Sequence, residues 1–597
     1  MKTISFEKPL RQTQTRDEHR ITLSIATVAD RDNIYRLRHE VYARELGQHA
    51  PNSFGSLRDP LDDSNIYLVA KTGDQIAGFI SLTPPEAHSF SIDKYFSRDA
   101  LPFGLDDATF EIRLLTVLKP HRGRELATLL MYAAFRWVEA HGGTRIIVIG
   151  RREVVEMYLR SGLKPLGMSA QSGAVTYDLL QTDISSLREH MKNFGGLLDR
   201  LESKTDWQLN FPFRKPANCF HGGAFIEAVG SRFDSLARSA EIINADVLDA
   251  WFPPSPKVLA ALTEYLPWLL RTSPPTACEG LVETIAKVRG VRPQNILPGA
   301  GSSDLIFRAL REWLTPKSHA LILDPTYGEY AHVLENVIGC TVDRLTLTRE
   351  NGYQVDLQRL EAAFADNYDL IVLVNPNSPT GRHIAREDLE RLLPKVPEQT
   401  RVWIDETYVE YSGAGESLEI FAARSENVIV CKSMSKVYGL SGARVAYLCA
   451  GPHQLEQLRA ITPPWVVSLP AQVAAVRALQ DPDYYVARYQ ETHHLREQFA
   501  NGLSALGFEV IPGIANFILC HLPPEGSDAA TVVQRCRTHG VFLRDARKMG
   551  SQLGTHAIRI AVKDAETNQK ILAILGEALA APVEISTHAA VVASVRA

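Results

Sequence analysis

The chain has 597 residues, 45% of them hydrophobic and 22% charged, which is typical of a globular protein with several domains. A net charge of −5 does not suggest nucleic acid or an anionic membrane as a partner. The seven cysteines are scattered and form no C-x-x-C pair, which argues against a disulfide framework or a zinc site, so we expect no metal. No apolar run approaches about 18 residues, and the opening "MKTISFEKPLRQTQTRDEHR" has no apolar core. We therefore expect neither a membrane span nor a secretory signal, and a cytoplasmic location.

Residues 21–180 have the pattern of one α/β domain. "RITLSIATV" predicts a strand, and the helical spacing of "DRDNIYRLRHEVYARELG" follows it. "IYLVAKTGDQIAGFISL" predicts a hairpin around "TGDQ", and "FEIRLLTVL" predicts a further strand. "RELATLLMYAAFRWVEAHGG" predicts a helix and "RIIVIG" another strand. We place a first domain at residues 1–190 and a mixed polar linker with one helical patch at residues 191–218.

From residue 219 onward, strand and helix patterns alternate. The apolar runs "HALILD", "LIVLVN", "RVWID" and "NVIVCKS" are typical of parallel strands buried on both faces. The pattern predicts a doubly wound α/β domain over residues 219–585. Its large part would span about 245–475, and a small C-terminal α/β part would comprise 219–244 and 476–585. Residues 586–597 would form a tail.

Polar residues follow several of these predicted strands, where α/β proteins place their binding sites. Lys436 could form a Schiff base with an aldehyde, and Asp405 could keep a ring nitrogen protonated. The glycine turn "LPGAGSSD" opens a helix whose first N–H groups could bind a phosphate, together with an arginine such as Arg444. These are the parts that pyridoxal 5'-phosphate needs.

Residues 219–580 resemble the fold-type I pyridoxal-phosphate enzymes of aminotransferase class I/II. Within that family they look most like histidinol-phosphate aminotransferases and threonine-phosphate decarboxylases. The resemblance is carried by "SMSKVYGLSGAR", by "HGGAF" at His221 and by "HAIRIAVKDAETNQKIL" near the C-terminus.

The resemblance implies a role for each matching residue. Lys436 would be the Schiff-base lysine and proton shuttle, and Asp405 would pair with the ring nitrogen. Tyr408 would contact the ring oxygen and Tyr327 would stack on the ring. The remaining implied cofactor-binding residues are Gly301, Ser302, Ser303, Asn377, Ser378, Ser433 and Arg444. The implied substrate-binding residues are Arg559, which would grip the α-carboxylate, Trp251 and His221.

The chain departs from the family pattern where the substrate is recognised. Ser378 stands directly before "PTG", where the family has an asparagine, and its role could be lost or taken by Asn377. Ser273 replaces a tyrosine that reaches the partner subunit's phosphate, and "LDAWFPPSP" replaces an asparagine-rich segment. These changes favour a specialised amino-acid substrate, as in natural-product biosynthesis.

The reaction itself stays open at this point. An aminotransferase-like reaction through a Cα carbanion (quinonoid) is favoured, because Arg559 would hold the carboxylate in the ring plane. The alternatives are decarboxylation, elimination and replacement at the β or γ carbon, and C–C bond formation, with S-adenosylmethionine as one candidate substrate. The resemblance also implies a homodimer, since such sites borrow residues from a partner subunit.

The first domain resembles the GNAT family of N-acetyltransferases. "VLKPHRGRELATLLMYAAFRWVEAHG" looks like the segment that binds the acyl donor, and "MYLRSGLKPLG" looks like the segment that carries the proton-donating tyrosine. "YRLRHEVYARELG" is similar to a helix of N-acyl amino acid and acyl-homoserine-lactone synthases, which also use acyl carrier proteins. The implied donor is acyl-CoA or an acyl carrier, and the donor-binding candidates are Arg122, Gly123, Arg124 and Tyr158.

Glu125 replaces a glycine of the donor-binding motif, and an anionic side chain is unfavourable beside a pyrophosphate. Three hypotheses for this domain therefore stay open. It could acylate an amino compound that the second domain makes, it could be an inactive structural or dimer-forming module, or it could recruit a partner.

Overall fold

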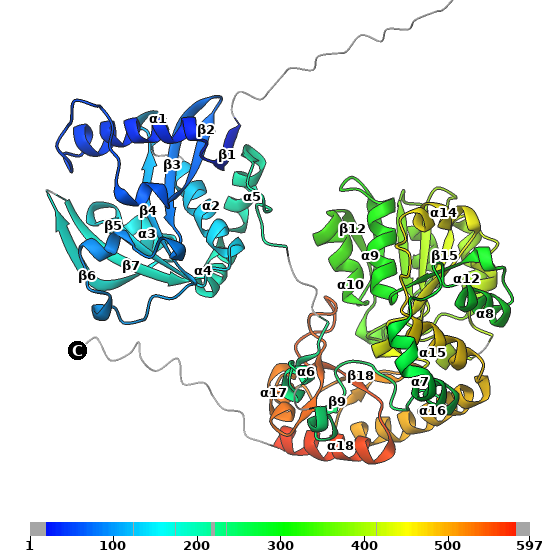
Figure 1. The fold of residues 1–597 in the computed structure, drawn as a ribbon. Coiled ribbons are helices and arrows are strands. Elements are labelled where there is room, and N and C mark those ends of the chain that lie inside the picture. The colour runs from blue at the N-terminus through cyan, green and yellow to red at the C-terminus, as the bar shows by residue number, and fades with distance from the viewer. Residues whose placement is uncertain are drawn as a thin grey trace, which may run out of the picture. The chain divides into compact units, whose positions relative to one another are not determined.

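The computed structural model describes residues 20–122, 125–173, 175–216, 221–233, 236–413 and 415–580. The candidates Gly123 and Arg124 lie outside this described part, as do the opening 1–19 segment and the predicted tail at 586–597. The chain divides into two compact units, Met1–Pro216 and Ala217–Ala597 (Figure 1). Among the described residues, none of the helices combines the length and hydrophobicity that a bilayer span needs.

The first unit is built on an eight-stranded sheet in the order β6-β7-β5-β4-β3-β2-β1-β8. Its strands are β1 (Ile21–Ile25), β2 (Ile66–Thr72), β3 (Gln75–Thr83), β4 (Thr109–Val117), β5 (Arg145–Arg151), β6 (Lys164–Ser172), β7 (Val175–Asp183) and β8 (Thr205–Trp207). Its helices are α1 (Val28–Arg38), α2 (Leu126–Ala140), α3 (Val155–Arg160), α4 (Ile184–Met191) and α5 (Gly195–Lys204). The helix α2 packs on β2, β3 and β4 through a nearly continuous apolar surface, so it is the main cover of this sheet.

The predicted strands, hairpin and helices of residues 21–151 are present, with one change. The helix after β1 ends its α-helical part at Arg38 and continues as a π-helical stretch, His39–Glu45. Thr27 caps the start of α1, because its hydroxyl accepts a hydrogen bond from the Asp30 N–H and the Asp30 carboxylate accepts one from the Thr27 N–H.

Residues 191–216, which the sequence pattern assigned to a linker, lie in the first unit. The helix α5 leads into β8, which adds to the edge of the sheet by pairing in parallel with β1. Tyr132 and Arg136 of α2 both donate to the carbonyl of Phe213, at 2.8 and 3.0 Å, which fastens the segment beyond β8. These contacts come from residues far away in the sequence, so the local pattern did not reveal them.

The second unit contains a seven-stranded sheet in the order β10-β16-β15-β14-β13-β11-β12. Its strands are β10 (Ile296–Gly299), β11 (His319–Asp324), β12 (Thr341–Thr346), β13 (Leu370–Val374), β14 (Arg401–Asp405), β15 (Val428–Ser433) and β16 (Ala446–Cys449). The strand β16 runs antiparallel to its two neighbours, and β11 to β15 pair in parallel with one another.

Alternate residues of these strands enter two different hydrophobic cores. Ile371 and Ile404 pack in the core that includes α7 (Pro256–Arg271), α8 (Glu279–Arg289) and α15 (Leu469–Leu479). Val372 and Trp403 pack in the core that includes α9 (Ser302–Trp313) and α14 (Pro452–Ala460). Helices therefore cover both faces of the sheet, which explains why the strands are continuous apolar runs and confirms the predicted doubly wound architecture.

A smaller part holds an antiparallel sheet in the order β17-β18-β21-β20 and a two-stranded pair of β9 with β19. These strands are β9 (Ile243–Asn244), β17 (Glu509–Val510), β18 (Phe517–His521), β19 (Val541–Phe542), β20 (Arg544–Asp545) and β21 (Ala557–Ala561). The remaining helices of the unit are α6 (Ala224–Val229), α10 (Gly328–Ala331), α11 (Leu357–Ala363), α12 (Arg386–Leu392), α13 (Glu419–Ala422), α16 (Pro482–Ala505), α17 (Ala529–Thr538) and α18 (Ala565–Ala580). The pairing of β9 with β19 ties the start of the unit to this C-terminal part.

Candidate functional site

Lys436 lies three residues beyond β15, at the carboxyl edge of the large sheet. Its Nζ donates a hydrogen bond to Asp249 Oδ1 at 2.8 Å and lies 3.4 Å from Ser441 Oγ. Burial lowers the pKa of Lys436, and the Asp249 carboxylate partly offsets this effect. The result is a mostly buried amine beside a carboxylate, suited to nucleophilic attack on a carbonyl once it loses its proton.

Asp405 ends the neighbouring strand β14 and is 3% exposed. Its Oδ2 accepts a hydrogen bond from Tyr330 Oη at 2.7 Å, and its Oδ1 accepts from Thr407 N and Oγ1 at 3.0 and 2.6 Å. Burial raises the pKa of Asp405 against the effect of these hydrogen bonds. Tyr408 is also buried, and its ring meets Phe517 of β18 edge to face at 5.2 Å.

The glycine turn before α9 is closed by an arginine. Gly301 has a φ of +96°, a conformation that favours glycine, and a Cβ there would meet the Arg444 guanidinium. Arg444 Nη1 donates to the carbonyl of Ser441 at 3.1 Å. A guanidinium at the N-terminus of a 12-residue helix makes a suitable position for a phosphate. Ser433, the last residue of β15, is buried, and its Oγ accepts a hydrogen bond from Ser435 N at 3.3 Å.

Ser303 and Tyr327 meet at a carboxylate that the sequence analysis did not single out. Glu329 Oε2 accepts hydrogen bonds from Ser303 Oγ at 2.9 Å and from Tyr327 Oη at 2.8 Å. His221 Nε2 lies 3.5 Å from the same oxygen, and His221 Nδ1 lies 3.4 Å from Tyr327 Oη. The structure thus brings His221, Ser303 and Tyr327 together around Glu329, whereas the Ser302 hydroxyl has no hydrogen bond to another described residue.

Arg559 lies in β21 and is 5% exposed. Its Nη1 donates to Ser378 Oγ at 3.1 Å and its Nη2 donates to the carbonyl of Asp246 at 3.0 Å. Burial and the nearby positive charge of Arg544 lower the pKa of Arg559 to about 10. The guanidinium therefore stays charged at neutral pH and can grip a carboxylate.

Ser378 and Asn377 have different roles in the structure. Asn377 Nδ2 donates to the Pro325 carbonyl at 2.9 Å and to Thr380 Oγ1 at 3.1 Å, and its Oδ1 accepts from Thr326 Oγ1 at 3.0 Å. Both hydrogens of the Asn377 amide are therefore engaged in bracing two loops. Ser378 instead contacts Arg559, the candidate group for binding a substrate carboxylate.

The indole N–H of Trp251, which the family resemblance implies on the substrate side, donates to Thr492 Oγ1 of α16 at 2.8 Å. The residue of this loop that contacts Lys436 is Asp249. A second lysine lies near the same aspartate: Lys563 Nζ is 3.5 Å from the Asp249 carbonyl oxygen. Burial lowers the pKa of Lys563 to about 8. Asp249 and Lys563 were missed in the sequence, although a carboxylate in "LDAWFPPSP" and a lysine four positions after Arg559 were visible there.

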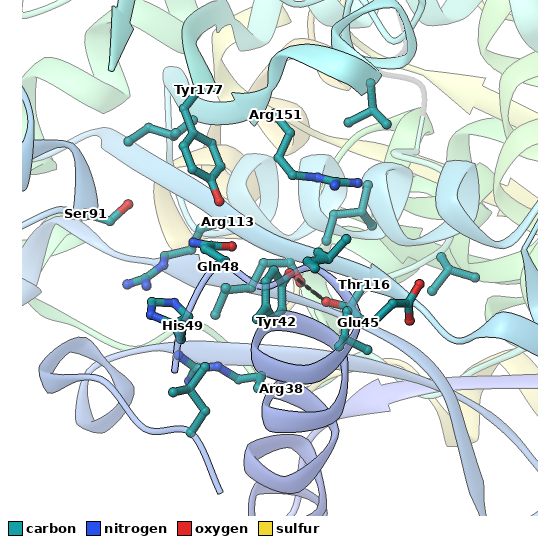
Figure 2. A pocket seen from close by; sticks show the side chains of 18 of the residues that line it. Arg38, Tyr42, Glu45, Gln48, His49, Ser91, Arg113, Thr116, Arg151 and Tyr177 are labelled. Atoms are coloured by element: carbon teal, nitrogen blue, oxygen red, sulfur yellow. Dashed lines mark hydrogen bonds between the residues drawn. The ribbon is translucent and has the colours of Figure 1, made fainter. Parts of the chain in front are cut away.

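The first unit contains a cavity of about 510 Å³ (Figure 2). The strands β4 and β5 pair from Thr109 to Ile112 and from Arg145 to Val148, and both continue beyond this paired stretch. Leu114 of β4 has a φ of +56°, and the register against β3 shifts nearby, which marks a bulge. The two strands separate beyond the paired stretch, and the cavity is lined by residues of both.

The predicted donor residues in the described part are Arg122 and Tyr158, and both line this cavity. Arg122 forms an ion pair with Glu45 of the π-helical stretch. Glu125 forms its ion pair with Arg200 at 3.3 Å, so its charge is partly balanced by α5. Tyr158 is buried, and burial raises the pKa of its hydroxyl well above the usual range, so it stays protonated.

Comparison with known proteins gives two family matches. Residues 253–575 match the family "Aminotransferase class I and II", and residues 31–163 match the "Acetyltransferase (GNAT) family". A histidinol-phosphate aminotransferase of Halalkalibacterium halodurans is 30% identical over 332 residues, which cover 55% of this chain and 87% of that protein. One of Rhodopseudomonas palustris is 28% identical over 335 residues, which cover 55% of this chain and 89% of that protein.

Two solved structures show the same fold in the second unit. The histidinol-phosphate aminotransferase of Sinorhizobium meliloti, in complex with pyridoxal-5'-phosphate, matches with a TM-score of 0.52 at 24% identity and covers 61% of this chain and 98% of its own. The L-threonine-O-3-phosphate decarboxylase of Porphyromonas gingivalis matches with a TM-score of 0.50 at 23% identity and covers 56% of this chain and 99% of its own.

Proposed function

The chain belongs to the aminotransferase class I and II family, and from this premise we propose that its second unit is a pyridoxal-phosphate enzyme that acts on an amino acid through Lys436. The observation that carries the proposal is the set of polar groups at one sheet edge: a buried lysine, a buried aspartate and an arginine over a glycine turn. The S. meliloti relative, whose structure holds pyridoxal phosphate, supports the choice of cofactor.

The residues present fit this cofactor. Arg444 packs against Gly301 at the start of α9, and the positive φ of Gly301 favours a residue without a side chain there. Asp405 is buried and held in place by Tyr330 and Thr407, as a partner of a protonated ring nitrogen must be. Arg559 Nε is buried and, in the described part of the chain, has no hydrogen-bond partner. When bound, pyridoxal phosphate supplies an aldehyde that links to amines and a ring that withdraws electrons from the substrate.

We assign a separate role to each of these side chains. Arg444 and the α9 N-terminus bind the phosphate, and Asp405 holds a proton at the ring nitrogen. Arg559, steadied by Ser378, binds the substrate carboxylate in a fixed orientation. Lys436 moves the proton at the substrate α-carbon, and Asp249 accepts a hydrogen bond from its Nζ. Tyr408, Tyr327 and His221 are the residues we propose around the ring and the substrate.

Proton exchange at the α-carbon tests this assignment against decarboxylation. We expect the cofactor-loaded protein to exchange the α-proton of its amino-acid substrate for deuterium in D₂O, observed by NMR. Release of CO₂ without α-proton exchange would favour the decarboxylase alternative. Loss of a β or γ substituent, with S-adenosylmethionine included in the panel, would favour elimination and replacement. A specialised biosynthetic substrate is supported by the departures at Ser273, Ser378 and the Trp251 loop.

A second candidate function rests on the cavity of the first unit. Its position at the separated ends of β4 and β5, with Arg122 and protonated Tyr158 in its lining, supports acyl transfer from acyl-CoA or an acyl carrier. The chain would then be a bifunctional enzyme in which residues 1–190 acylate an amine. Binding of acetyl-CoA, measured by calorimetry with the full chain and with Arg122→Gln, tests this proposal. No binding at millimolar acetyl-CoA would favour an inactive module.

We also propose that the protein is a cytoplasmic homodimer. The helix α7 exposes an unusual number of large apolar side chains, which supports an interface on this helix. They are Leu259, Tyr265, Leu266, Trp268 and Leu270.

A further inference from the structure

A second arginine lies beside Arg559 in the second unit. Arg544 of β20 and Arg559 of β21 stand opposite each other in the antiparallel register of the two strands, and both side chains are buried. Residues in this relation extend from the same face of a sheet. The positive charge of Arg544 also lowers the pKa of Arg559, which shows that the two guanidiniums are close in space. Two adjacent arginines could bind a substrate with two anionic groups if both were available to it.

Arg544 is not available, because Asp246 neutralises it. Arg544 Nε lies 2.6 Å from Asp246 Oδ1, and only 7% of the arginine side chain and 8% of the aspartate side chain are exposed. The carbonyl oxygen of Asp246 accepts a hydrogen bond from Arg559 Nη2 at 3.0 Å, so this one residue contacts both arginines. Its carboxylate pairs with Arg544, and Arg559 has no ion pair with any carboxylate among the described residues.

Residues 221–223 cover the ion pair of Arg544 and Asp246. Arg544 Nη2 donates a hydrogen bond to the carbonyl of His221 at 2.6 Å, and the N–H of Gly223 donates to Asp246 Oδ2 at 3.1 Å. Gly222 lies between them with a φ of +82°, and a Cβ there would meet both charged groups. The pair is thus shielded from water, which strengthens the attraction between its charges. A second anion of a substrate would have to compete with this attraction.

The other charges near Lys436 do not replace the arginine that Asp246 occupies. Asp249 pairs with Lys436 at 2.8 Å and also borders Lys563, whose pKa is lowered by burial to about 8. Glu329 adds a further buried carboxylate, which accepts a hydrogen bond from Tyr327. A substrate with an anionic side chain would therefore be repelled by carboxylates around the site.

We propose that the substrate of the second unit is an amino acid whose α-carboxylate is its only anionic group, and that Asp246 determines this selectivity. Arg559 binds that carboxylate, and Asp246 occupies the arginine that a side-chain phosphate or carboxylate would need. The side chain of the substrate is then neutral or cationic. Selectivity of this kind comes from leaving the wrong ligand with an unpaired charge. The inference rests on the function proposed above for the second unit and names the substrate class of the same site.

Pairs of amino acids that differ by one anionic group test the proposal. The pairs are glutamine and glutamate, asparagine and aspartate, and threonine and O-phosphothreonine, each added to the full chain loaded with pyridoxal phosphate. Binding is measured as the change in cofactor absorbance, so turnover is not required. We expect the anionic member of each pair to bind at least about 10-fold more weakly than its neutral partner, as for a charge left unpaired in a buried site.

Two outcomes separate a failure of this inference from a failure of the proposed function. Equal or tighter binding of an anionic member of any pair would overturn the inference and leave the function proposed for Lys436 intact. A cofactor absorbance that changes with none of the twenty L-amino acids would overturn that function, and the inference with it.

Asp246→Asn removes the carboxylate and keeps the size of the side chain. We expect the preference for the neutral partner to fall by at least about 10-fold in this variant, because Arg544 then lacks a counter-charge and attracts the second anion. The double variant Asp246→Asn with Arg544→Gln guards against a folding defect, since it removes both charges of the buried pair. It should gain no affinity for the anionic members.

Asp528→Asn is the matched control, because it removes a carboxylate that caps α17 through Thr531. We expect the wild-type preference in this variant. A preference that is unchanged in Asp246→Asn, or that falls equally in Asp246→Asn and in the double variant, would show that Asp246 does not determine the selectivity.

Discussion

At the scale of single residues, the charge of the Lys436 amine depends on a carboxylate that lies outside the sequence motif of Lys436. Asp249 reaches it across 187 positions of sequence and is the largest influence that keeps its amine charged against burial. Lys563 borders the same aspartate. The protonation of the Lys436 amine is therefore set by a small charge cluster and not by burial alone.

Asp249→Asn should shift the titration of Lys436 to lower pH, because the charge that opposes burial is removed. The rate at which pyridoxal phosphate reacts with the cofactor-free protein, measured against pH, reports the neutral amine. We expect the midpoint of this profile to fall in Asp249→Asn and to stay unchanged in Asp528→Asn, a control aspartate that caps α17 through Thr531. A profile that shifts equally in both variants would show that Asp249 has no special role.

Lys563 predicts a pH dependence of stability. Its pKa falls from 10.5 in the unfolded chain to about 8 in the folded protein, so its burial costs stability below pH 8. That cost disappears as pH rises from 8 to 10.5, because the folded protein loses the proton first and the unfolded chain loses it only near pH 10.5. Lys563→Met should therefore raise the Tm of the second unit at pH 7, by an amount equivalent to at most about 3 kcal/mol, and much less at pH 10.5. A Tm gain that does not depend on pH would contradict this reasoning.

At the scale of elements, the site depends on where strands end and helices begin. The strands β14 and β15 end at Asp405 and Ser433, on one edge of the sheet. In the turn before α9, Gly301 contacts Arg444, which lies in the segment after β15. Side chains on a parallel sheet converge at its carboxyl edge, and a helix N-terminus adds a partial positive charge there. The geometry of the proposed phosphate position thus comes from the backbone as much as from side chains.

Gly301→Ala should weaken cofactor binding. The added methyl group would displace the Arg444 guanidinium, and the φ of +96° disfavours any side chain. We expect the Kd for pyridoxal phosphate, followed by absorbance, to rise by at least about 10-fold, as when a charge-assisted contact is lost. Gly280→Ala is the control, because a Cβ at Gly280 of α8 meets nothing within 4 Å. Equal affinity in both variants would remove the turn from the site.

At the scale of the whole molecule, two units with their own cores share one chain. The large strands and the residues at their ends could be predicted from sequence, because strands buried on both faces are continuous apolar runs followed by polar loops. Asp249, Glu329 and Lys563 could not, because their roles depend on contacts across the fold. The strand β8 also escaped notice, because three residues are too few to show a periodic pattern.

The apolar surface of α7 predicts the assembly state. Trp268 is 47% exposed on this helix, and Trp268→Asp should convert the proposed dimer to a monomer by placing a charge in the interface. Light scattering after gel filtration measures the mass. Phe54→Asp, at a side chain 90% exposed in the first unit, should leave the dimer intact. A wild-type protein that is already monomeric would contradict the proposed interface.

The central claim is that Lys436 is the covalent anchor of pyridoxal phosphate. The most direct measurement is reduction of the cofactor-loaded protein with borohydride, followed by peptide mass mapping. We expect the mass of reduced cofactor on the peptide carrying Lys436 and its loss in Lys436→Ala, while Lys563 stays unmodified. Attachment to another lysine, or no attachment with excess cofactor, would contradict it.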